Sequence, residues 1–342
     1  MTEKLRWAVM GTGAIARAFA QKIASSETST LVAVSSRSRA KAEAFGREFG
    51  VARCYGGYEG VLEDPQVEAV YISMIHPLHA EWAIRAAEAG KPILLEKPMT
   101  MNAAEAELVI EAARRHKVFL YEAFMYRCHP QTRKILEMIG SGALGRVRVI
   151  HASFSFLWGE DFEHRILKHQ LGGGSILDVG TYTVSMARLL AGATLGQPFA
   201  DPTHVTGFAQ IGPQSRVDEY AVGSLCFEGG IFAQVTCGCR LRQDNTLRVY
   251  GTEGGLHVPV PWGPCHEPGV CTMYRLGTNS EMLETIQIPC GRGLFTIEID
   301  TIAERIREGR TEAPEMTWAD SLGNMRTLDR WRAAVGMKYD FE

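Results

Sequence analysis

The sequence has no long uninterrupted apolar stretch, and its longest apolar runs are short and broken. A helix that crosses a membrane needs about 20 consecutive apolar residues, so we predict no membrane span. The first four residues, Met1-Thr2-Glu3-Lys4, run directly into a strand pattern and lack the apolar segment of a secretory signal peptide. We therefore expect a cytoplasmic protein.

The sequence also lacks a strong charge of either sign. Its 36 basic and 39 acidic residues are interspersed and leave a net charge of −3. Nucleic-acid-binding domains usually carry a basic face, so nucleic acid is not an expected partner. The composition, 46% hydrophobic and 22% charged, is that of a globular protein. Because 342 residues exceed what one hydrophobic core usually supports, we predict two domains.

Cysteines are present, but zinc-type spacing is not. Without a signal peptide, the eight cysteines are expected to be reduced thiols. Cys237-Gly238-Cys239 lies in a strand-like run, and no second cysteine or histidine pair has the spacing of a zinc site. We interpret this pair as two small side chains on one face of a strand and predict no metal.

Residues 1–125 alternate between strand and helix patterns. Apolar runs predict strands at residues 5–10, 31–35, 69–72, 93–95 and 118–121. Helix patterns lie between them, at residues 14–25, 39–49, 80–89 and 103–115. Strands separated by helices form βαβ units, and right-handed crossovers then give a doubly wound parallel sheet. We predict a dinucleotide-binding Rossmann domain over residues 1–125.

Residues 126–342 have a different pattern. They contain an alternating strand at 147–157, a helix at 175–190, strand-like runs with turns between 205 and 258, and helices at 296–308 and 318–335. Runs with such turn signals are typical of an antiparallel sheet. We predict a second, α+β domain that binds substrate; residues 259–293, rich in Pro, Gly and Cys, show no clear pattern.

The first strand ends in a glycine loop with the G-x-G-x-x-A pattern. Gly11 allows a tight turn, Gly13 lets a pyrophosphate approach the backbone, and Ala16 is small enough for the following helix to pack on the strand. The start of that helix then faces the phosphates. The six loop residues predicted to hold a dinucleotide are Gly11, Thr12, Gly13, Ala14, Ile15 and Ala16.

The end of the second strand distinguishes between nicotinamide cofactors. NAD enzymes usually place an acid there to hold the ribose hydroxyls. This chain has Ser35-Ser36-Arg37-Ser38-Arg39 instead. Ser36 and Arg37 suit a 2′-phosphate, because arginine can bind phosphate through two hydrogen bonds, so we predict NADP rather than NAD. Arg39 and Lys41 are equally consistent with a solvated helix face.

The third and fourth strands end in further candidate residues. Lys97, in Glu96-Lys97-Pro98, directly follows a buried apolar strand, where ligands of parallel sheets bind. A lysine there can stabilise an alkoxide-like transition state, and Glu96 is an obvious partner. On spacing alone, a lysine that merely reaches water fits equally well. Ser73, His76 and His79 follow the third strand and would border the cofactor, although either histidine fits a core or capping role equally well.

A glycine-led helix carries the remaining candidates. Gly172-Gly173-Gly174 precedes Asp178 and Tyr182, which are four residues apart and so share one helical face. Tyrosine can exchange a proton with a substrate when a nearby lysine stabilises its phenolate. From this segment alone, a core tyrosine and a capping aspartate remain an alternative.

Together these motifs resemble the glucose–fructose oxidoreductase/inositol dehydrogenase/rhizopine-catabolism (Gfo/Idh/MocA) family over nearly the whole chain. The resemblance rests on the glycine loop, on Glu96-Lys97-Pro98, and on Asp178 and Tyr182 after three glycines. Segments 75–79, 121–127, 251–255 and 339–342 are most similar to the dimeric dihydrodiol dehydrogenase group, which includes NADP-dependent D-xylose dehydrogenases.

The resemblance implies a function and roles for several residues. It implies hydride transfer between NADP and a small sugar, polyol or trans-dihydrodiol, with Lys97, Tyr182 and Asp178 catalytic. It also implies that Arg127 neighbours the nicotinamide or substrate, and that an open sheet in the second domain forms a homodimer or dimer of dimers. Met74-Ile75-His76 departs from the Thr-Pro-Asn common in the family, which leaves the ribose contacts open.

The substrate is not named by the sequence. Candidate substrate contacts, besides Lys97, Asp178 and Tyr182, are Tyr126, Trp158 and Arg165. Arg165 and Lys168 fit either an anionic sugar or an ordinary charged surface. Three rival functions share the fold: an oxidoreductase that retains its cofactor and couples two sugars, a non-enzymatic NADP sensor, and a reductase of a larger planar substrate. Sensors of this type tend to lose the catalytic lysine or tyrosine, and Lys97 and Tyr182 are both present.

Overall fold

A computed structural model describes residues 3–341 of the chain. The chain divides into two compact units. Unit 1 comprises the described residues up to Cys128 together with Arg292–Ser321, and unit 2 comprises His129–Gly291 and the described residues from Leu322. No helix within residues 3–341 is both long and apolar enough to cross a membrane.

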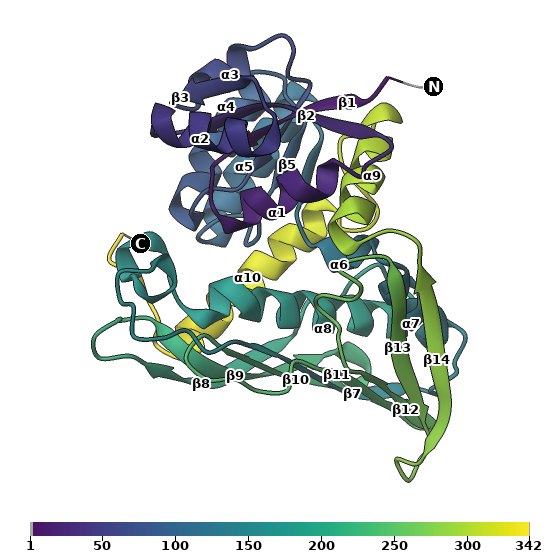
Figure 1. The fold of residues 1–342 in the computed structure, drawn as a ribbon. Helices are drawn as coiled ribbons and strands as arrows, with labels where there is room; N and C mark the ends of the chain where they lie inside the picture. Colours follow the sequence, from purple (N-terminus) through teal and green to yellow (C-terminus); the bar gives the residue numbers. More distant parts are fainter. Residues whose placement is uncertain (1–2, 342) are drawn as a thin grey trace. The chain divides into compact units, whose positions relative to one another are not determined.

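Unit 1 contains a six-stranded parallel sheet in the order β3-β2-β1-β4-β5-β6 (Figure 1). Its strands are β1 (Leu5–Met10), β2 (Ser29–Ser36), β3 (Arg53–Gly56), β4 (Ala69–Ile72), β5 (Ile93–Leu95) and β6 (Leu120–Glu122). The central strands β4 and β5 are buried at every position, as expected for a parallel sheet covered on both faces. The reversal of strand order at β1 and β4 is that of a doubly wound fold, so this prediction is confirmed.

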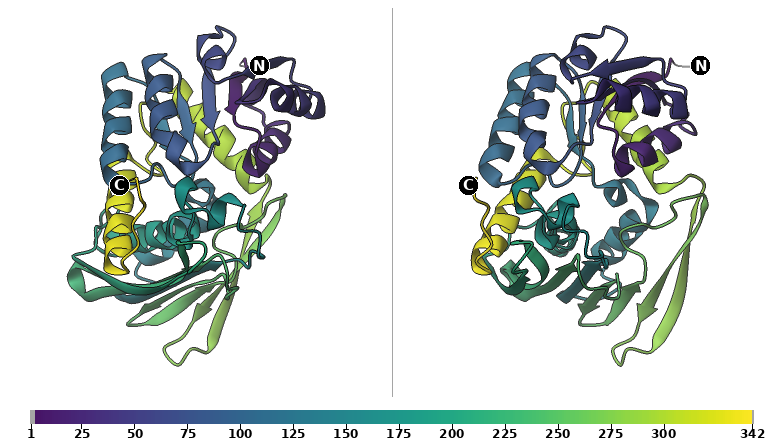
Figure 2. Two further views of the ribbon diagram at one scale, coloured as in Figure 1. Left: turned by 90° about the vertical axis from the view of Figure 1, so that its left-hand side faces the viewer. Right: turned by 60° about the vertical axis from the view of Figure 1, so that its left-hand side comes forward.

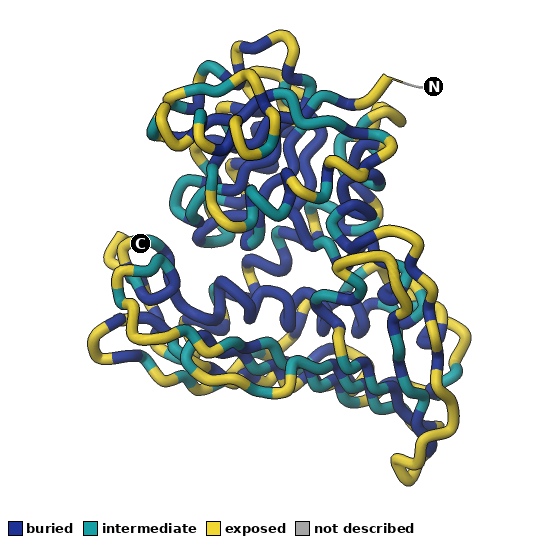
Figure 3. Tube along the Cα trace, viewed as in Figure 1, coloured by how far each residue is buried: buried dark blue, intermediate teal, exposed yellow. Residues whose placement is uncertain are grey.

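Helices connect these strands in turn: α1 (Ala14–Ile23), α2 (Arg39–Phe49), α3 (Glu59–Glu63), α4 (His79–Glu88) and α5 (Ala103–His116). A short helix, α6 (Met125–Cys128), follows β6. α4 and α5 pack against each other, and α1 packs against a later helix, α9 (Leu294–Arg307). Figure 3 shows β4, β5 and β6 in the buried colour and outer turns of the helices exposed.

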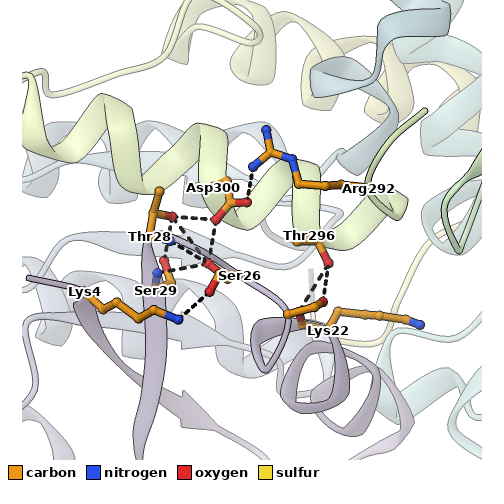
Figure 4. Close-up of polar contacts among 9 residues, drawn as sticks. Lys4, Lys22, Ser26, Thr28, Ser29, Arg292, Thr296 and Asp300 are labelled. Atoms are coloured by element: carbon orange, nitrogen blue, oxygen red, sulfur yellow. Dashed lines mark hydrogen bonds and ion pairs between the residues drawn. The ribbon is translucent and has the colours of Figure 1, made fainter. Parts of the chain in front are cut away.

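Unit 1 differs from the sequence prediction in the segment Arg292–Ser321, which the prediction assigned to the second domain. Asp300 on α9 attaches this segment to the start of β2 (Figure 4). Its Oδ1 accepts hydrogen bonds from Ser26 Oγ at 2.5 Å and Thr28 Oγ1 at 2.6 Å, and its Oδ2 accepts one from Arg292 at 2.5 Å. Asp300 is buried, so these three donors stabilise a charge that would otherwise be costly there.

Unit 2 contains an eight-stranded sheet in the order β14-β13-β12-β11-β7-β10-β9-β8 (Figures 1 and 2). Its strands are β7 (Val147–Ser155), β8 (His204–Ile211), β9 (Asp218–Phe227), β10 (Ile231–Gly238), β11 (Leu247–Gly251), β12 (Gly254–Val258), β13 (Gly269–Leu276) and β14 (Met282–Cys290). All neighbours are antiparallel except β7 and β10. The mainly antiparallel α+β prediction is confirmed, and the unassigned residues 259–293 supply β13 and β14.

One face of this sheet is covered by α8 (Thr181–Thr194), which packs on β7 and β10. Residues 181–192 of α8 are all buried, so it is a core helix. The other unit 2 helices are α7 (Pro130–Gly140) and most of α10 (Trp318–Ala334), whose first residues belong to unit 1. On the opposite sheet face, exposed apolar side chains occur on adjacent strands: Phe208, 81% exposed, is paired with Val222, and Phe232 lies on β10.

Candidate active site

The carboxyl ends of four parallel strands of unit 1 lie side by side. Met10 at the end of β1 is paired with Ser35 on β2 and Ile72 on β4, and Ile72 is paired with Leu95 on β5. The residues that follow these strands are therefore brought to one edge of the sheet, where parallel α/β sheets bind ligands. These residues are the glycine loop, Ser36 and Arg37, Ser73, and Glu96 and Lys97.

Gly11 begins the glycine loop in a conformation that favours glycine. Its φ is +123°, and its N–H donates to Ser35 O at 2.9 Å. A Cβ at this position would lie 2.9 Å from Ser73 Oγ and 3.0 Å from Ser73 O, closer than side chains tolerate. Ser73 itself donates from its N–H and its hydroxyl to Met10 O, at 3.0 and 3.1 Å. The close approach of β1 and β4 thus requires glycine.

Gly13 precedes the first turn of α1 and, unlike Gly11, borders open space. Among the described residues 3–341, no side chain caps the helix, and a Cβ at Gly13 would meet no atom within 4 Å. The N–H groups at a helix start attract anions, and the open space above Gly13 leaves them accessible. Ala16 is fully buried, whereas Thr12, Ala14 and Ile15 are partly or fully exposed. The loop therefore fits a dinucleotide pyrophosphate.

The end of β2 carries no acid. Ser36 is buried, Arg37 is exposed, and Ser38 caps α2 by accepting a hydrogen bond from Lys41 N. Arg39 forms an ion pair with Glu43 on the helix surface, with Nε and Oε1 2.9 Å apart. Of the basic residues here, Arg37 is the one that directly follows the strand.

The two histidines after β4 are buried in unit 1. His79 is fully buried, with Nδ1 2.9 Å from Pro98 O and Nε2 3.0 Å from Met74 O. Both nitrogens thus contact the main chain, which favours the core role that the sequence left open for His79. His76 lies in a short 3₁₀ turn with its ring centroid 5.7 Å from that of His79.

Glu96 positions the exit of β5. Its Oε1 accepts from Tyr71 Oη at 2.5 Å, and its Oε2 accepts from the backbone N–H of Lys97 at 3.2 Å. Lys97 is partly exposed and forms a cis peptide with Pro98. Glu298 on α9, which the sequence analysis did not single out, is buried near Glu96; burial and the Glu96 charge raise its pKa well above the ordinary value. Both effects favour the neutral form of Glu298.

Tyr126 and Arg127, on α6, are buried. Arg127 forms an ion pair with Asp320, with Nη1 and Oδ2 3.0 Å apart, and its Nε donates to Tyr126 Oη at 3.2 Å. A buried guanidinium needs such a partner. Sequence reasoning missed Asp320, because it lies far away along the chain in a segment predicted to belong to the second domain.

In unit 2, Asp218 holds the start of the glycine-led helix. Its Oδ2 accepts from Ser175 Oγ at 2.9 Å and from the Ile176 N–H at 2.6 Å. Gly174 has a φ of +112°, and a Cβ there would lie 2.3 Å from Asp218 Oδ1. Burial raises the pKa of Asp218 to about 6, against which the two hydrogen bonds act.

The helix begins with a π-helical turn, Ile176–Gly180, before α8. Such turns are frequent at functional sites. Asp178 lies in this turn and Tyr182 at the start of α8, and both are buried. Asp178 Oδ1 accepts from Arg165 Nη2 at 2.9 Å, so the structure brings these two predicted site residues together.

Aromatic rings surround Tyr182. Its ring is edge-on to Phe154, with centroids 5.2 Å apart, and to Trp262, at 6.1 Å. Trp262 was missed from the sequence because it lies in the segment without a clear pattern. Trp158 stacks on His164 at 3.9 Å, and Lys168 pairs with the exposed Glu163, which favours a surface role for Lys168.

Comparison with known proteins agrees with this geometry. Residues 5–124 match the model of the oxidoreductase family with an NAD-binding Rossmann fold (GFO_IDH_MocA), and residues 132–257 match the GFO/IDH/MocA C-terminal domain. A mouse trans-1,2-dihydrobenzene-1,2-diol dehydrogenase is 30% identical over 98% of both chains. A D-xylose 1-dehydrogenase (NADP(+)) from Haloferax volcanii is 32% identical over 87% of both.

Among solved structures, a 3-ketoreductase from Actinomadura kijaniata in complex with NADP and TDP-benzene superposes with a TM-score of 0.86. It is 27% identical, over 97% of this chain and 98% of that one. The prediction of a nicotinamide-dependent oxidoreductase rather than a sensor is confirmed. With its Rossmann unit, its mainly antiparallel second unit and two matching domain models, the chain belongs to the Gfo/Idh/MocA oxidoreductase family.

Proposed function

We propose that this protein is an NADP-dependent dehydrogenase or reductase that acts on the CH–OH or C=O group of a small sugar, polyol or trans-dihydrodiol. The observation that carries this proposal is the shared edge of β1, β2, β4 and β5, which presents the open glycine loop, a strand end without an acid, and Lys97. The dihydrodiol and xylose dehydrogenases among the relatives support this substrate class.

Gly13 and the first turn of α1 would hold the pyrophosphate, and Ser36 and Arg37 the 2′-phosphate. An arginine at the end of β2 favours the phosphorylated cofactor because it supplies both charge and paired hydrogen bonds. The xylose dehydrogenase relative is named for NADP, and the ketoreductase structure contains it. When bound, the cofactor accepts hydride from the substrate or donates hydride to it.

Lys97 supplies positive charge for the alkoxide character of the transition state. Its backbone is fixed by Glu96, which is itself fixed by Tyr71, so the lysine leaves the strand in a defined direction. Tyr182 takes the hydroxyl proton in oxidation and returns it in reduction. Asp178 lies in the π turn and forms an ion pair with Arg165, and the two side chains would help to orient the substrate. Structures of the related ketoreductase include a lysine-to-alanine and a tyrosine-to-phenylalanine variant.

The test is formation of reduced cofactor with NADP and NAD in parallel, across xylose, glucose, inositol, a sugar acid and a dihydrodiol. We expect turnover with NADP on at least one of these substrates. Turnover with NAD alone would contradict the role of Arg37 and leave the oxidoreductase reaction intact. No turnover with any pairing, despite cofactor binding, would contradict the proposed substrate class.

A second candidate is an oxidoreductase that keeps its cofactor and couples two sugars. It is favoured by the likeness to an aldose–aldose oxidoreductase from Caulobacter crescentus, which is 25% identical over 98% of both chains with a TM-score of 0.86. This candidate predicts that the purified protein carries one nicotinamide per chain, which release by denaturation and absorbance would detect. Protein purified without nicotinamide would exclude it.

The uncovered face of the unit 2 sheet supports a homodimer or a dimer of dimers. Phe208, Val222 and Phe232 are exposed apolar residues on the same face of adjacent strands. Large exposed apolar side chains grouped on one face of a sheet are typical of a protein–protein contact.

A further inference from the structure

Four side chains of unit 2 form a cluster of sulfur and nitrogen atoms outside the proposed catalytic residues. Cys271 lies on β13 and is paired with Ile288 on the neighbouring strand β14. Cys290 lies two residues after Ile288 on β14. Cys265 lies in the loop before β13, and His129 precedes α7, which packs against β14. We refer to these four residues as the thiol cluster.

The sulfur atoms of the cluster lie close together. Cys271 Sγ is 3.6 Å from Cys290 Sγ and 2.7 Å from Cys265 Sγ. A ring nitrogen of His129 lies within 4.8 Å of both Cys271 Sγ and Cys290 Sγ. Two thiolates bound to one tetrahedral zinc ion are about 3.8 Å apart, because each Zn–S bond is about 2.3 Å. The Cys271–Cys290 separation of 3.6 Å is close to this value, whereas Cys265 must move outward by about 1 Å to reach it.

His129 adds an observation independent of the thiols. It is fully buried, and its Nδ1 accepts a hydrogen bond from the backbone N–H of Gln131 at 3.1 Å. A neutral imidazole that accepts at Nδ1 carries its proton on Nε2, and this buried Nε2–H has no hydrogen-bond partner among residues 3–341. A buried donor beside thiol groups is satisfied when one of them becomes a thiolate.

Without a cation, burial favours the protonated form of Cys271. Burial, together with the neighbouring thiols, raises the pKa of Cys271 well above its ordinary value. A bound metal ion reverses this preference, because a coordinating thiol loses its proton. Soft thiolate ligands select zinc or copper(I) over hard cations such as magnesium or calcium.

We propose that Cys265, Cys271 and Cys290 bind one zinc ion through three thiolates, and that His129 donates a hydrogen bond from Nε2 to one of them. Binding releases the three thiol protons to solvent. Cys265 is partly exposed, so a water molecule can take the fourth zinc position, as in other sites with three protein ligands. The ligands come from two adjacent strands and the loop before them, and the site therefore stabilises this edge of unit 2.

The test is zinc binding to the full-length protein after reduction and removal of metal. Zinc is titrated anaerobically against a chromogenic chelator, and bound zinc is measured by elemental analysis. We expect one zinc per chain, with affinity at least 100-fold weaker in Cys271→Ser and Cys265→Ser. Cys226→Ser, which alters a partly exposed thiol on β9, is the matched control and should bind zinc normally.

Two further measurements separate metal binding from misfolding. Zinc should raise the melting temperature of the wild type and of Cys226→Ser, but not that of Cys265→Ser. Cobalt in the wild type should give a sulfur-to-metal charge-transfer band, and His129→Gln should keep this band while binding about 10-fold more weakly. The proposal is overturned if reduced protein binds no zinc or if both ligand variants bind it normally. It is also overturned if a Cys265–Cys271 disulfide persists under reducing conditions and prevents zinc binding.

Discussion

Replacing Gly13 with alanine should separate cofactor binding from folding. Gly13 has φ −74° and ψ −176°, which alanine adopts without strain, and the added Cβ meets no atom within 4 Å. Loss of a glycine N-cap destabilises slightly, and reduced freedom of the unfolded chain offsets this by about 0.4–1 kcal/mol. The free energy of unfolding should therefore change by less than about 1 kcal/mol.

The affinity for NADP should fall sharply in the same variant. The space that the methyl group fills is the space through which a phosphate would reach the start of α1. Loss of one hydrogen bond to a charged phosphate costs about 1.5–3 kcal/mol, which corresponds to a loss of roughly 10- to 100-fold in affinity. Calorimetric titration with NADP and chemical denaturation would measure both quantities on the same samples.

The control for this experiment is Gly140→Ala. Gly140 lies at the end of α7 in unit 2, and a Cβ there also meets no atom within 4 Å. It should leave NADP affinity unchanged. Gly13→Ala with wild-type affinity would refute the placement of the pyrophosphate, whereas a large loss of stability would show that the loop is not open as described.

Three other predictions concern stability and assembly. Asp300→Ala removes the carboxylate that accepts hydrogen bonds from Ser26, Thr28 and Arg292. It should lower the free energy of unfolding, measured by urea denaturation, by about 2–4 kcal/mol. Unchanged stability would contradict the role of α9 in unit 1. Burial raises the pKa of Glu122 from 4.5 to about 7, so between pH 4.5 and 7 the folded state holds a proton that the unfolded state loses. The free energy of unfolding should therefore fall by up to roughly 3 kcal/mol as the pH rises through this range. Glu122→Gln should remove that part of the pH dependence, and an unaltered profile would assign it to other groups. If the protein is the dimer proposed above, Phe208→Asp should convert it to monomers in light scattering, and an unchanged mass would place the subunit contact elsewhere.

The parallel sheet could be predicted because its strands are continuous apolar runs separated by helices. β3, Arg53–Gly56, could not, because it is an edge strand whose residues are only partly buried and show no apolar run. The assignment of α9 to unit 1 was also missed. It depends on contacts of Asp300 with residues far away along the chain, and helical periodicity carries no information about such contacts.

Local motifs could be predicted more reliably than side-chain partners. The residues around Gly11, Gly13 and Lys97 lie at strand ends, and the sequence shows those positions directly. The partner of Arg127 is Asp320, which only the folded chain reveals. The thiol cluster was missed for a similar reason, because its members come from a loop, two strands and a helix start rather than from closely spaced pairs.

Lys97→Met removes the positive charge that we propose stabilises the transition state of hydride transfer. Single-turnover kinetics with NADP and an active substrate, together with NADP titration, would separate chemistry from binding. The control is Lys134→Met, which removes a lysine from the surface of α7. We predict that Lys97→Met reduces turnover at least 100-fold with near-normal NADP affinity, while Lys134→Met behaves as the wild type. Wild-type turnover in Lys97→Met would exclude this role for Lys97.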